Sequence, residues 1–183
     1  MKKIYVLNGV GTAGKGEFAS LIGKYIPTFK YSIIDLPKGA ATILGWDGGK
    51  TEKDRKFLSD IVDLASAYND APFKDVMSIV ADCKNNLIED DVLVIDMRDP
   101  KDIARAVETF GAETILVRNP RVQKIESNHA DADVENYEYD YIIENDGTLE
   151  QLETVAKLFV RDIICWSSIP AEKKPIVLTC SKY

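Results

Sequence analysis

The chain has 183 residues, enough for one domain with a full hydrophobic core. Its formal net charge of −7 argues against a nucleic acid polymer as the main partner, because binding a phosphate backbone requires a basic face. The sequence has no apolar stretch near the ~20 residues that span a bilayer, and the apolar run after Lys2 and Lys3 is too short for a signal peptide. The three cysteines lack metal-ligand spacing, so we expect them to be free thiols in a reducing compartment. Together with the preceding observations on apolar segments, this predicts a cytoplasmic location and no membrane partner.

Apolar runs alternate with helically spaced apolar residues along most of the chain. Buried strands are predicted at 3–8, 31–34, 91–96, 113–118 and 139–145. Helical patterns begin at Gly14, within 36–68 with a break at 45–49, and at Thr51, Ala71, Pro100 and Thr148. This alternation predicts an α/β fold, a three-layer α-β-α sandwich with a five-stranded parallel sheet. One domain would span residues 1–165, followed by a C-terminal tail, 166–183, in which the segment PIVLTC has the pattern of one more short strand without a predicted place in the sheet.

Four glycines follow the first strand within the segment GVGTAGKG, residues 9–16. Their spacing with Lys15 fits G-x-x-x-x-G-K, the phosphate-binding loop, in its required place between a strand and a helix. Unobstructed backbone N–H groups would form an anion cradle, and the helix N-terminus adds its dipole. Lys15 would reach the outer phosphates as a point charge. The predicted ATP-binding residues here are Gly9, Gly11, Thr12, Ala13, Gly14, Lys15, Gly16 and Glu17.

The same glycines also fit a second motif, the dinucleotide fingerprint G-x-G-x-x-G at positions 9, 11 and 14. That motif expects an acidic residue ~20 positions further on, and Asp35 qualifies. We favour the phosphate-binding loop, because it requires a lysine directly after the last glycine and the dinucleotide site does not. A glycine-rich turn without a ligand is the third alternative.

The loop departs from the usual pattern at one position. Most such loops carry Ser or Thr after the lysine as a metal ligand, whereas this chain has Gly16 followed by Glu17. A carboxylate beside the β- and γ-phosphates would repel them unless it binds magnesium or points away. This departure keeps open an alternative function, a nucleotide-binding regulator without phosphotransfer.

The chain resembles the P-loop nucleoside and nucleotide kinase superfamily, closest to bacterial and phage deoxynucleoside monophosphate kinase-like proteins. The matching segments are LNGVGTAGKGEFA, SIIDLPKGAATILGWDGGKTEKDRKFLSD, MRDPKDI and NHADADVENYEYDYIIENDGTLEQL, the last of which is shared with dephospho-coenzyme A kinases. The resemblance implies a P-loop kinase fold with an acceptor-binding insertion at about 36–85 and a small lid at about 119–137. It also implies transfer of the γ-phosphoryl group of ATP, with Mg²⁺, to a small phosphorylated substrate; a homodimer is compatible with it.

The resemblance assigns roles to individual residues. Asp96, which ends the strand VLVID, would hold magnesium through water, or would only form a strand-end turn. Asp35 would orient or deprotonate the acceptor, or would only cap a helix. Arg98, in the motif Arg98-Asp99-Pro100, and Arg55 would bind the acceptor phosphate, or would form surface ion pairs.

Two further segments would border the nucleotide. Arg118 and Arg121 lie where the superfamily places its lid, and closure would bring both arginines onto the transferring phosphoryl group. Asn145 follows the fifth strand, in a loop that the resemblance places beside adenine. The sequence therefore predicts an ATP-dependent kinase of a (deoxy)nucleoside monophosphate. A dephospho-coenzyme A-type kinase, an ATP-binding regulator and, more remotely, an NAD-dependent oxidoreductase remain as alternatives.

Overall fold

A single parallel sheet forms the centre of the protein. The computed structural model describes residues 3–85, 91–122, 134–164 and 175–182. Within these residues, six strands lie in the order β2-β3-β1-β4-β5-β6. Their bounds are β1 Lys3–Asn8, β2 Thr28–Ser32, β3 Val92–Asp96, β4 Glu113–Arg118, β5 Tyr141–Glu144 and β6 Ile176–Thr179.

The sequence predicts a sheet of five strands, whereas the described residues form a sheet of six. The segment PIVLTC of the expected tail supplies β6, which pairs in parallel with β5 and places Ile176 beside Tyr141. A strand of 4 residues shows too little alternation of apolar and polar side chains for its sequence to indicate its place in the sheet. That place depends on the neighbouring strand with which it pairs.

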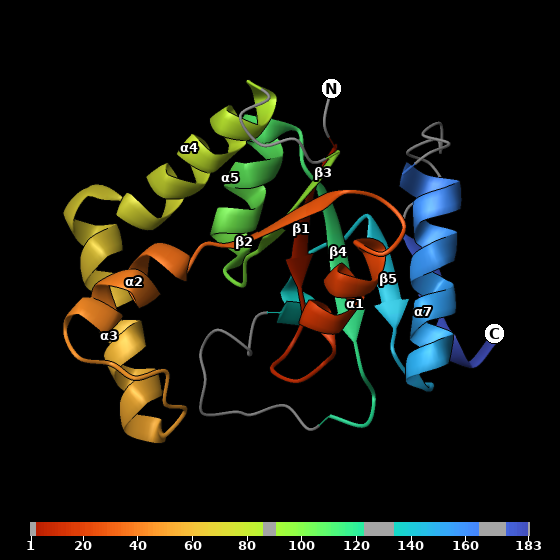
Figure 1. Cartoon of the computed structure of the whole chain (residues 1–183), viewed down its shortest axis with the longest axis horizontal. Coiled ribbons are helices and arrows are strands. Elements are labelled where there is room, and N and C mark those ends of the chain that lie inside the picture. The colour runs from red at the N-terminus through yellow and green to blue at the C-terminus, as the bar shows by residue number, and fades with distance from the viewer. Residues whose placement is uncertain (1–2, 86–90, 123–133, 165–174, 183) are drawn as a thin grey trace.

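Helices cover both faces of the sheet (Figure 1). One face carries α1 (Lys15–Ile22) and α7 (Leu149–Leu158), which pack against each other, and α7 continues into the π-helical turn η2 (Phe159–Ile164). The opposite face carries α5 (Pro100–Phe110), which contacts β1 and β4. The short 3₁₀ turns η1 (Val134–Asn136) and η4 (Cys180–Lys182) precede β5 and follow β6.

Three helices form a lobe beyond the edge strand β2. They are α2 (Asp35–Ile43), α3 (Glu52–Asn69) and α4 (Ala71–Lys84), and they contact one another at the left of Figure 1. The lobe joins the core through stacked rings of Phe73 on α4 and Phe110 on α5, whose centroids lie 5.8 Å apart. A hydrogen bond from Tyr31 on β2 to Asp75 on α4 makes a second connection.

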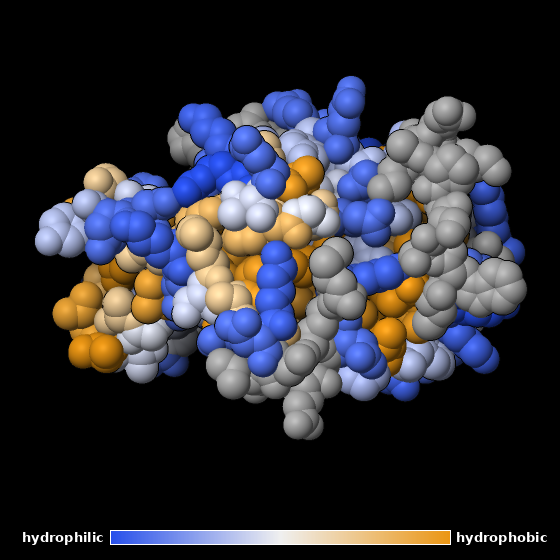
Figure 2. All heavy atoms as spheres, turned by 90° about the horizontal axis from the view of Figure 1, so that it is seen from above, coloured by the Kyte–Doolittle hydropathy of each residue, from blue (hydrophilic) through white to orange (hydrophobic). Residues whose placement is uncertain are grey.

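The lobe exposes apolar side chains. The helix α3 has no buried residue, and Figure 2 shows apolar surface at the left end of the molecule, over the lobe. The exposed apolar residues of the lobe include Ile43, Leu44, Leu64, Tyr68 and Met77. No helix of the described part of the chain is long and apolar enough to cross a bilayer.

Helix starts follow the capping residues that the sequence predicts. Thr51 and Asp54 form a capping box at the start of α3, and Thr148 forms another with Gln151 at the start of α7. The Asp99 carboxylate accepts from the Lys101 N–H at the start of α5, where Pro100 is the first helical residue.

The second strand lies earlier than the sequence pattern predicts. It ends at Ser32 rather than Ile34, and Asp35 is the first residue of α2. The Asp35 carboxylate accepts a hydrogen bond of 2.9 Å from the Ser32 N–H, which turns the chain away from the sheet. The predicted strand included Ile33 and Ile34 because both are apolar. Hydrophobic periodicity does not detect a local turn of this kind, which depends on a side-chain hydrogen bond to the backbone.

Candidate active site

The site begins where the central strand β1 ends at Asn8. This fully buried side chain accepts from the Gly9 N–H at 2.7 Å, and its amide donates to the Tyr139 hydroxyl at 2.7 Å and to the Arg98 carbonyl at 3.3 Å. Asn8 therefore fixes the start of the glycine-rich loop against two other segments. Sequence analysis assigned it no role, since an asparagine before a glycine also marks an ordinary turn.

Two loop glycines are required by close contacts as well as by backbone geometry. Gly9 has a φ of +149°, and a Cβ there would lie 2.3 Å from the Val117 carbonyl oxygen. Gly14 caps α1 with a φ of +101°, and its Cβ would lie 2.4 Å from the Asn145 amide nitrogen. The loop thus sits directly against β4 and the loop after β5, and side chains at these positions would displace it.

Lys15 is buried within this loop. Its ammonium donates to the carbonyls of Gly9 and Val10, at 2.5 and 3.1 Å. The loop therefore holds a positive charge at the N-terminus of α1, where an anion would also meet the helix dipole. The position is the one that the phosphate-binding motif requires.

A pocket of about 170 Å³ lies beside Lys15, between α1 and the ends of β1, β2 and β3. It brings together four predicted site residues, Lys15, Gly16, Asp35 and Asp96. The other lining residues were not predicted: Leu7, Ala19, Lys30, Tyr31, Ser32 and Val94. Strand alternation could have found those on β2, but the prediction placed that strand too late to orient Lys30 and Ser32.

Asp96 is the most unusual group in the pocket. Its Oδ1 atom is buried and has no hydrogen-bond partner among the described residues. Burial raises the pKa of this carboxyl above its ordinary value, while the charges of Lys15 and Arg98 act to lower it. A buried carboxylate oxygen without a partner fits a cation ligand, directly or through water. The described residues hold no group of three or more His, Cys, Asp and Glu side chains around one point, so Mg²⁺ would depend on phosphate and water for most of its ligands.

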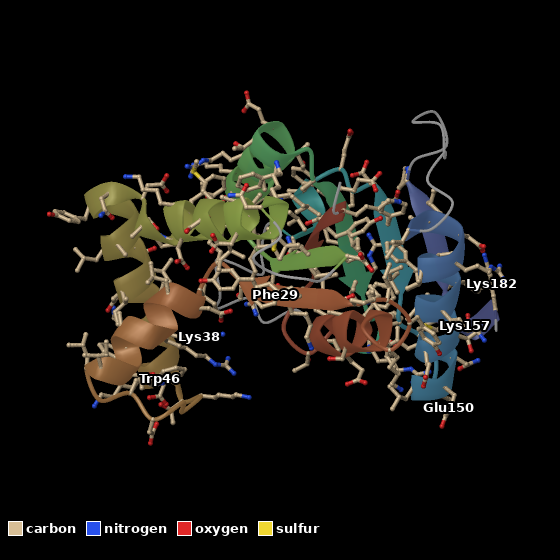
Figure 3. All side chains as sticks on the ribbon, turned by 45° about the horizontal axis from the view of Figure 1, so that its top comes forward. Phe29, Lys38, Trp46, Glu150, Lys157 and Lys182 are labelled. Carbon is tan, nitrogen blue, oxygen red and sulfur yellow. The ribbon has the colours of Figure 1, made fainter. Side chains whose placement is uncertain are left out.

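Asp35 combines the two roles considered from sequence. Its carboxylate accepts from the Ser32 N–H and pairs with Lys38 at 3.1 Å, while 40% of the side chain stays exposed toward the pocket and solvent. Figure 3 shows Lys38 on α2, with Trp46 after the other end of that helix. The turn that starts α2 therefore also presents a carboxylate to the pocket.

The four arginines predicted for the site lie outside the pocket beside Lys15. Arg98 is half-buried in the loop after β3, and Arg55 is exposed on α3. Arg118 is paired with Glu135 and Glu144, which raise its pKa, and lines a separate cavity of about 540 Å³. Arg121 donates to the Asp146 carbonyl at 2.6 Å. Most of the expected lid, residues 123–133, lies outside the described residues.

Asn145, which is predicted to border adenine, contacts the glycine-rich loop. Its amide donates to the Ala13 carbonyl at 2.9 Å, which places the loop after β5 against the glycine-rich loop. Glu17 is exposed on α1 and does not line the pocket. A Cβ at Gly16 would meet no atom within 4 Å, so the missing hydroxyl leaves open space.

The sheet order bears on the dinucleotide alternative. Strand β3 lies between β1 and β2, so Asp35 is two strands away from the glycine-rich loop. In the dinucleotide fold the acidic residue ends the strand directly beside β1. The order therefore favours a phosphate-binding loop of the nucleoside triphosphate type.

Comparison with known proteins gives a likeness of fold. No protein-family model matches the chain, and no curated protein matches it in sequence. The structure TT1252 from Thermus thermophilus is 16% identical, with a TM-score of 0.50, over 88% of this chain and 98% of that one. Shikimate kinase from Aquifex aeolicus is 11% identical, with a TM-score of 0.44, over 90% of this chain and 99% of that one. A protein from Chloroflexus aurantiacus is 10% identical, with a TM-score of 0.39, over 64% of this chain, which spans 60% of that protein.

The Thermus protein thus has a similar fold, and fold is all that an identity of 16% supports. The other two likenesses are weaker still. The activity must therefore be argued from the site itself.

Proposed function

We propose that this chain transfers the γ-phosphoryl group of ATP to a small phosphorylated acceptor, and that the acceptor is a (deoxy)nucleoside monophosphate. The observation that carries the proposal is one pocket in which Lys15 of the glycine-rich loop meets Asp96 and Asp35. A cation at a helix N-terminus suits a polyphosphate, and two carboxylates beside it suit a magnesium-bound donor and an acceptor.

Each residue has a distinct part in the proposed transfer. The backbone N–H groups of residues 11–16 would bind the donor phosphates, and Lys15 would exchange its carbonyl partners for phosphate oxygens. Asp35 would orient the acceptor; a phosphate oxygen needs no strong base, so orientation is the larger contribution. Bound Mg²⁺ would supply charge neutralisation on the β- and γ-phosphates, with Asp96 as its protein ligand through water.

The arginines are proposed for the closed form of the site. Arg98, in the loop after β3, and Arg55, on α3, would bind the acceptor phosphate, since a guanidinium group suits phosphate oxygens. Arg118 and Arg121 would have to leave Glu135, Glu144 and the Asp146 carbonyl to reach the phosphoryl group. Asn145 would border adenine from the loop that it joins to Ala13.

Replacement of Lys15 tests this mechanism. We expect Lys15→Ala to reduce phosphoryl transfer at least about 100-fold, because it removes a preorganised charge at the transferring group. The matched control is Lys24→Ala, an exposed lysine at the other end of α1 that pairs with Glu153. ATP consumption is measured across the nucleoside monophosphates, and circular dichroism checks the fold. Retained turnover in folded Lys15→Ala protein would contradict the proposal.

A nucleotide-binding regulator is the second candidate, and Gly16 favours it because the usual metal-binding hydroxyl is missing. Calorimetry would then find ATP or ADP bound without turnover, and Glu17→Thr would raise ATP affinity. A thermal-shift comparison of ATP, ADP and NAD separates both candidates from an oxidoreductase. The homodimer, the cytoplasmic location and the identity of the acceptor stay predictions.

A further inference from the structure

One cation in the pocket has no part in the mechanism above. In the sheet, Lys30 lies beside Val94, and Val94 lies beside Tyr5. Because aligned residues of parallel strands point to the same face, Lys30 projects on the face where Tyr5 packs against Phe159 below α7. Ser32 and Asp96, two residues further along, project on that face too. Lys30 is therefore on the α1 side of the edge strand.

A shallow groove runs between Lys30 and α1. Leu7 and Val94 form its floor, and Gly16 and Ala19 form its wall on α1. Both wall residues are small, and the space beside Gly16 is open to at least 4 Å from an ideal Cβ. A Ser or Thr at position 16 would project into this space.

The Lys30 ammonium reaches α1, on the other side of this groove from its own strand. It donates to the Ser20 hydroxyl at 2.9 Å, and that hydroxyl donates to the Gly16 carbonyl at 2.8 Å. Among the described residues no carboxylate pairs with Lys30, whereas the neighbouring Lys24 and Lys38 each have an acidic partner. Lys30 is an exposed cation held over the groove by a neutral hydroxyl, a bond weaker than one to an anion.

We propose that Lys30 binds the phosphate group of the acceptor, which lies in the groove between α1 and β2. The inference rests on the proposed function and adds a residue and a position to it. A phosphate there would lie between Lys15 and Lys30, in the pocket that Asp35 lines on the acceptor side and Asp96 on the donor side. The pocket that contains the groove has a volume of about 170 Å³. For scale, an engineered protein cavity of about 150 Å³ holds one benzene molecule. The groove therefore takes a phosphate and the start of its sugar, and leaves a nucleobase outside, toward the lobe.

The test compares Lys30→Met with Lys30→Arg and with the control Lys24→Met. For each deoxynucleoside monophosphate that the wild type phosphorylates, we expect Lys30→Met to raise the acceptor KM about 10- to 100-fold, the value of a lost hydrogen bond between charged groups. The ATP KM should change less than about twofold. Lys30→Arg should restore most of the acceptor affinity, and Lys24→Met should match the wild type. A melting temperature for each variant controls for folding.

Calorimetry with each monophosphate, in the presence of ADP and Mg²⁺, adds a reading independent of turnover. Equal acceptor affinity in Lys30→Met and wild type would overturn the inference while leaving the kinase intact. A parallel rise in both acceptor and ATP KM would also overturn it, since it would place Lys30 on the donor. Wild-type protein that binds ATP but no monophosphate would overturn the proposed acceptor class, and the inference with it.

Discussion

Asp96 shows a conflict between stability and chemistry within a single residue. Its carboxylate is largely buried, one of its oxygens lacks a partner among the described residues, and burial raises its pKa. A raised pKa means that the folded protein disfavours the charged form relative to the unfolded chain. The ionised group therefore costs stability once the pH rises above the ordinary carboxyl value. Sites that bind ligand charge commonly carry such a cost.

Asp96→Asn should separate the two effects. We expect a melting temperature about 2–4 °C higher than wild type at pH 8, since about 1 kcal/mol corresponds to that shift in a chain of this size. The gain should shrink as the pH falls toward the ordinary carboxyl value, because protonation makes the wild-type carboxyl neutral as well. Activity should fall with the loss of the proposed magnesium ligand. Scanning calorimetry at pH 8 and at a series of lower pH values provides the measurement, and an equal or lower melting temperature at pH 8 would refute the argument.

The sequence predicted the residues whose chemistry is tied to a local motif. Lys15 follows from the glycine spacing, and Asp96 follows from the end of its strand, where parallel sheets place their ligands. Asp35 was predicted at a strand end but begins α2, and it reaches the pocket from that helix start. Lys30 and Ser32 were missed because their role depends on which face of an edge strand they occupy. That face was unknown while the bounds of β2 were wrong by a few residues.

At the scale of elements, the site depends on how three chain segments meet at Asn8. The glycine-rich loop, the loop after β3 and the segment before β5 each contribute one partner to its side chain. Tyr139 completes the junction, since its hydroxyl accepts from Asn8 and donates to the Val134 carbonyl at 2.8 Å. The junction fixes the relative positions of the loops that carry Lys15 and Arg98.

Tyr139→Phe should weaken this junction without changing the packing of the ring. We expect the free energy of unfolding to fall by about 1–3 kcal/mol, because the buried Asn8 amide and the Val134 carbonyl both lose a partner. Tyr137→Phe is the matched control: that ring touches Tyr139, with centroids 5.1 Å apart, but Tyr137 is only partly buried. Urea unfolding compares the two variants. Equal stabilities would mean that the Tyr139 hydroxyl does not hold the junction.

The predicted elements succeeded where apolar runs were long and capping residues were clear. The strands β1, β3 and β4 lie where the runs 3–8, 91–96 and 113–118 predict them, within a residue. The junction at Asn8 could not be predicted in the same way. It joins residues up to 131 positions apart, and hydrophobic periodicity carries no information on which distant polar groups will pair.

At the scale of the whole molecule, the two sheet edges serve different ends of the site. The β2 edge leads into the helical lobe and the groove at Lys30. At the β6 edge, the turn η4 that follows the strand contains Ser181. The N–H and the hydroxyl of Ser181 donate to the Asp146 carboxylate at 2.9 and 2.6 Å. These bonds lower the pKa of Asp146. The last strand therefore holds the loop that carries Asn145, which in turn contacts the glycine-rich loop.

Deleting residues 176–183 should therefore affect both the sheet and the nucleotide side of the site. The deletion removes the partly buried Ile176 and Leu178 and the buried Cys180, and it leaves the β5 edge unpaired. We expect a loss of about 2–3 kcal/mol from these side chains, or about 5–10 °C in melting temperature. We also expect weaker ATP binding by calorimetry, because the loop with Asn145 loses its support.

Ser181→Ala separates these two consequences, since it keeps β6 and the backbone N–H bond to Asp146 and removes only the bond from the hydroxyl, the larger cause of the lowered pKa. The pKa of Asp146, followed by NMR, should rise toward the ordinary carboxyl value. Because the folded pKa is depressed, the stabilisation is present above the unfolded pKa and is lost as the pH falls through the folded one. The variant should therefore match wild type in melting temperature in strong acid and fall below it near neutral pH. If ATP binding weakens in the deletion but not in Ser181→Ala, the strand supports the loop through its packing and backbone, and the hydroxyl bond to Asp146 is secondary.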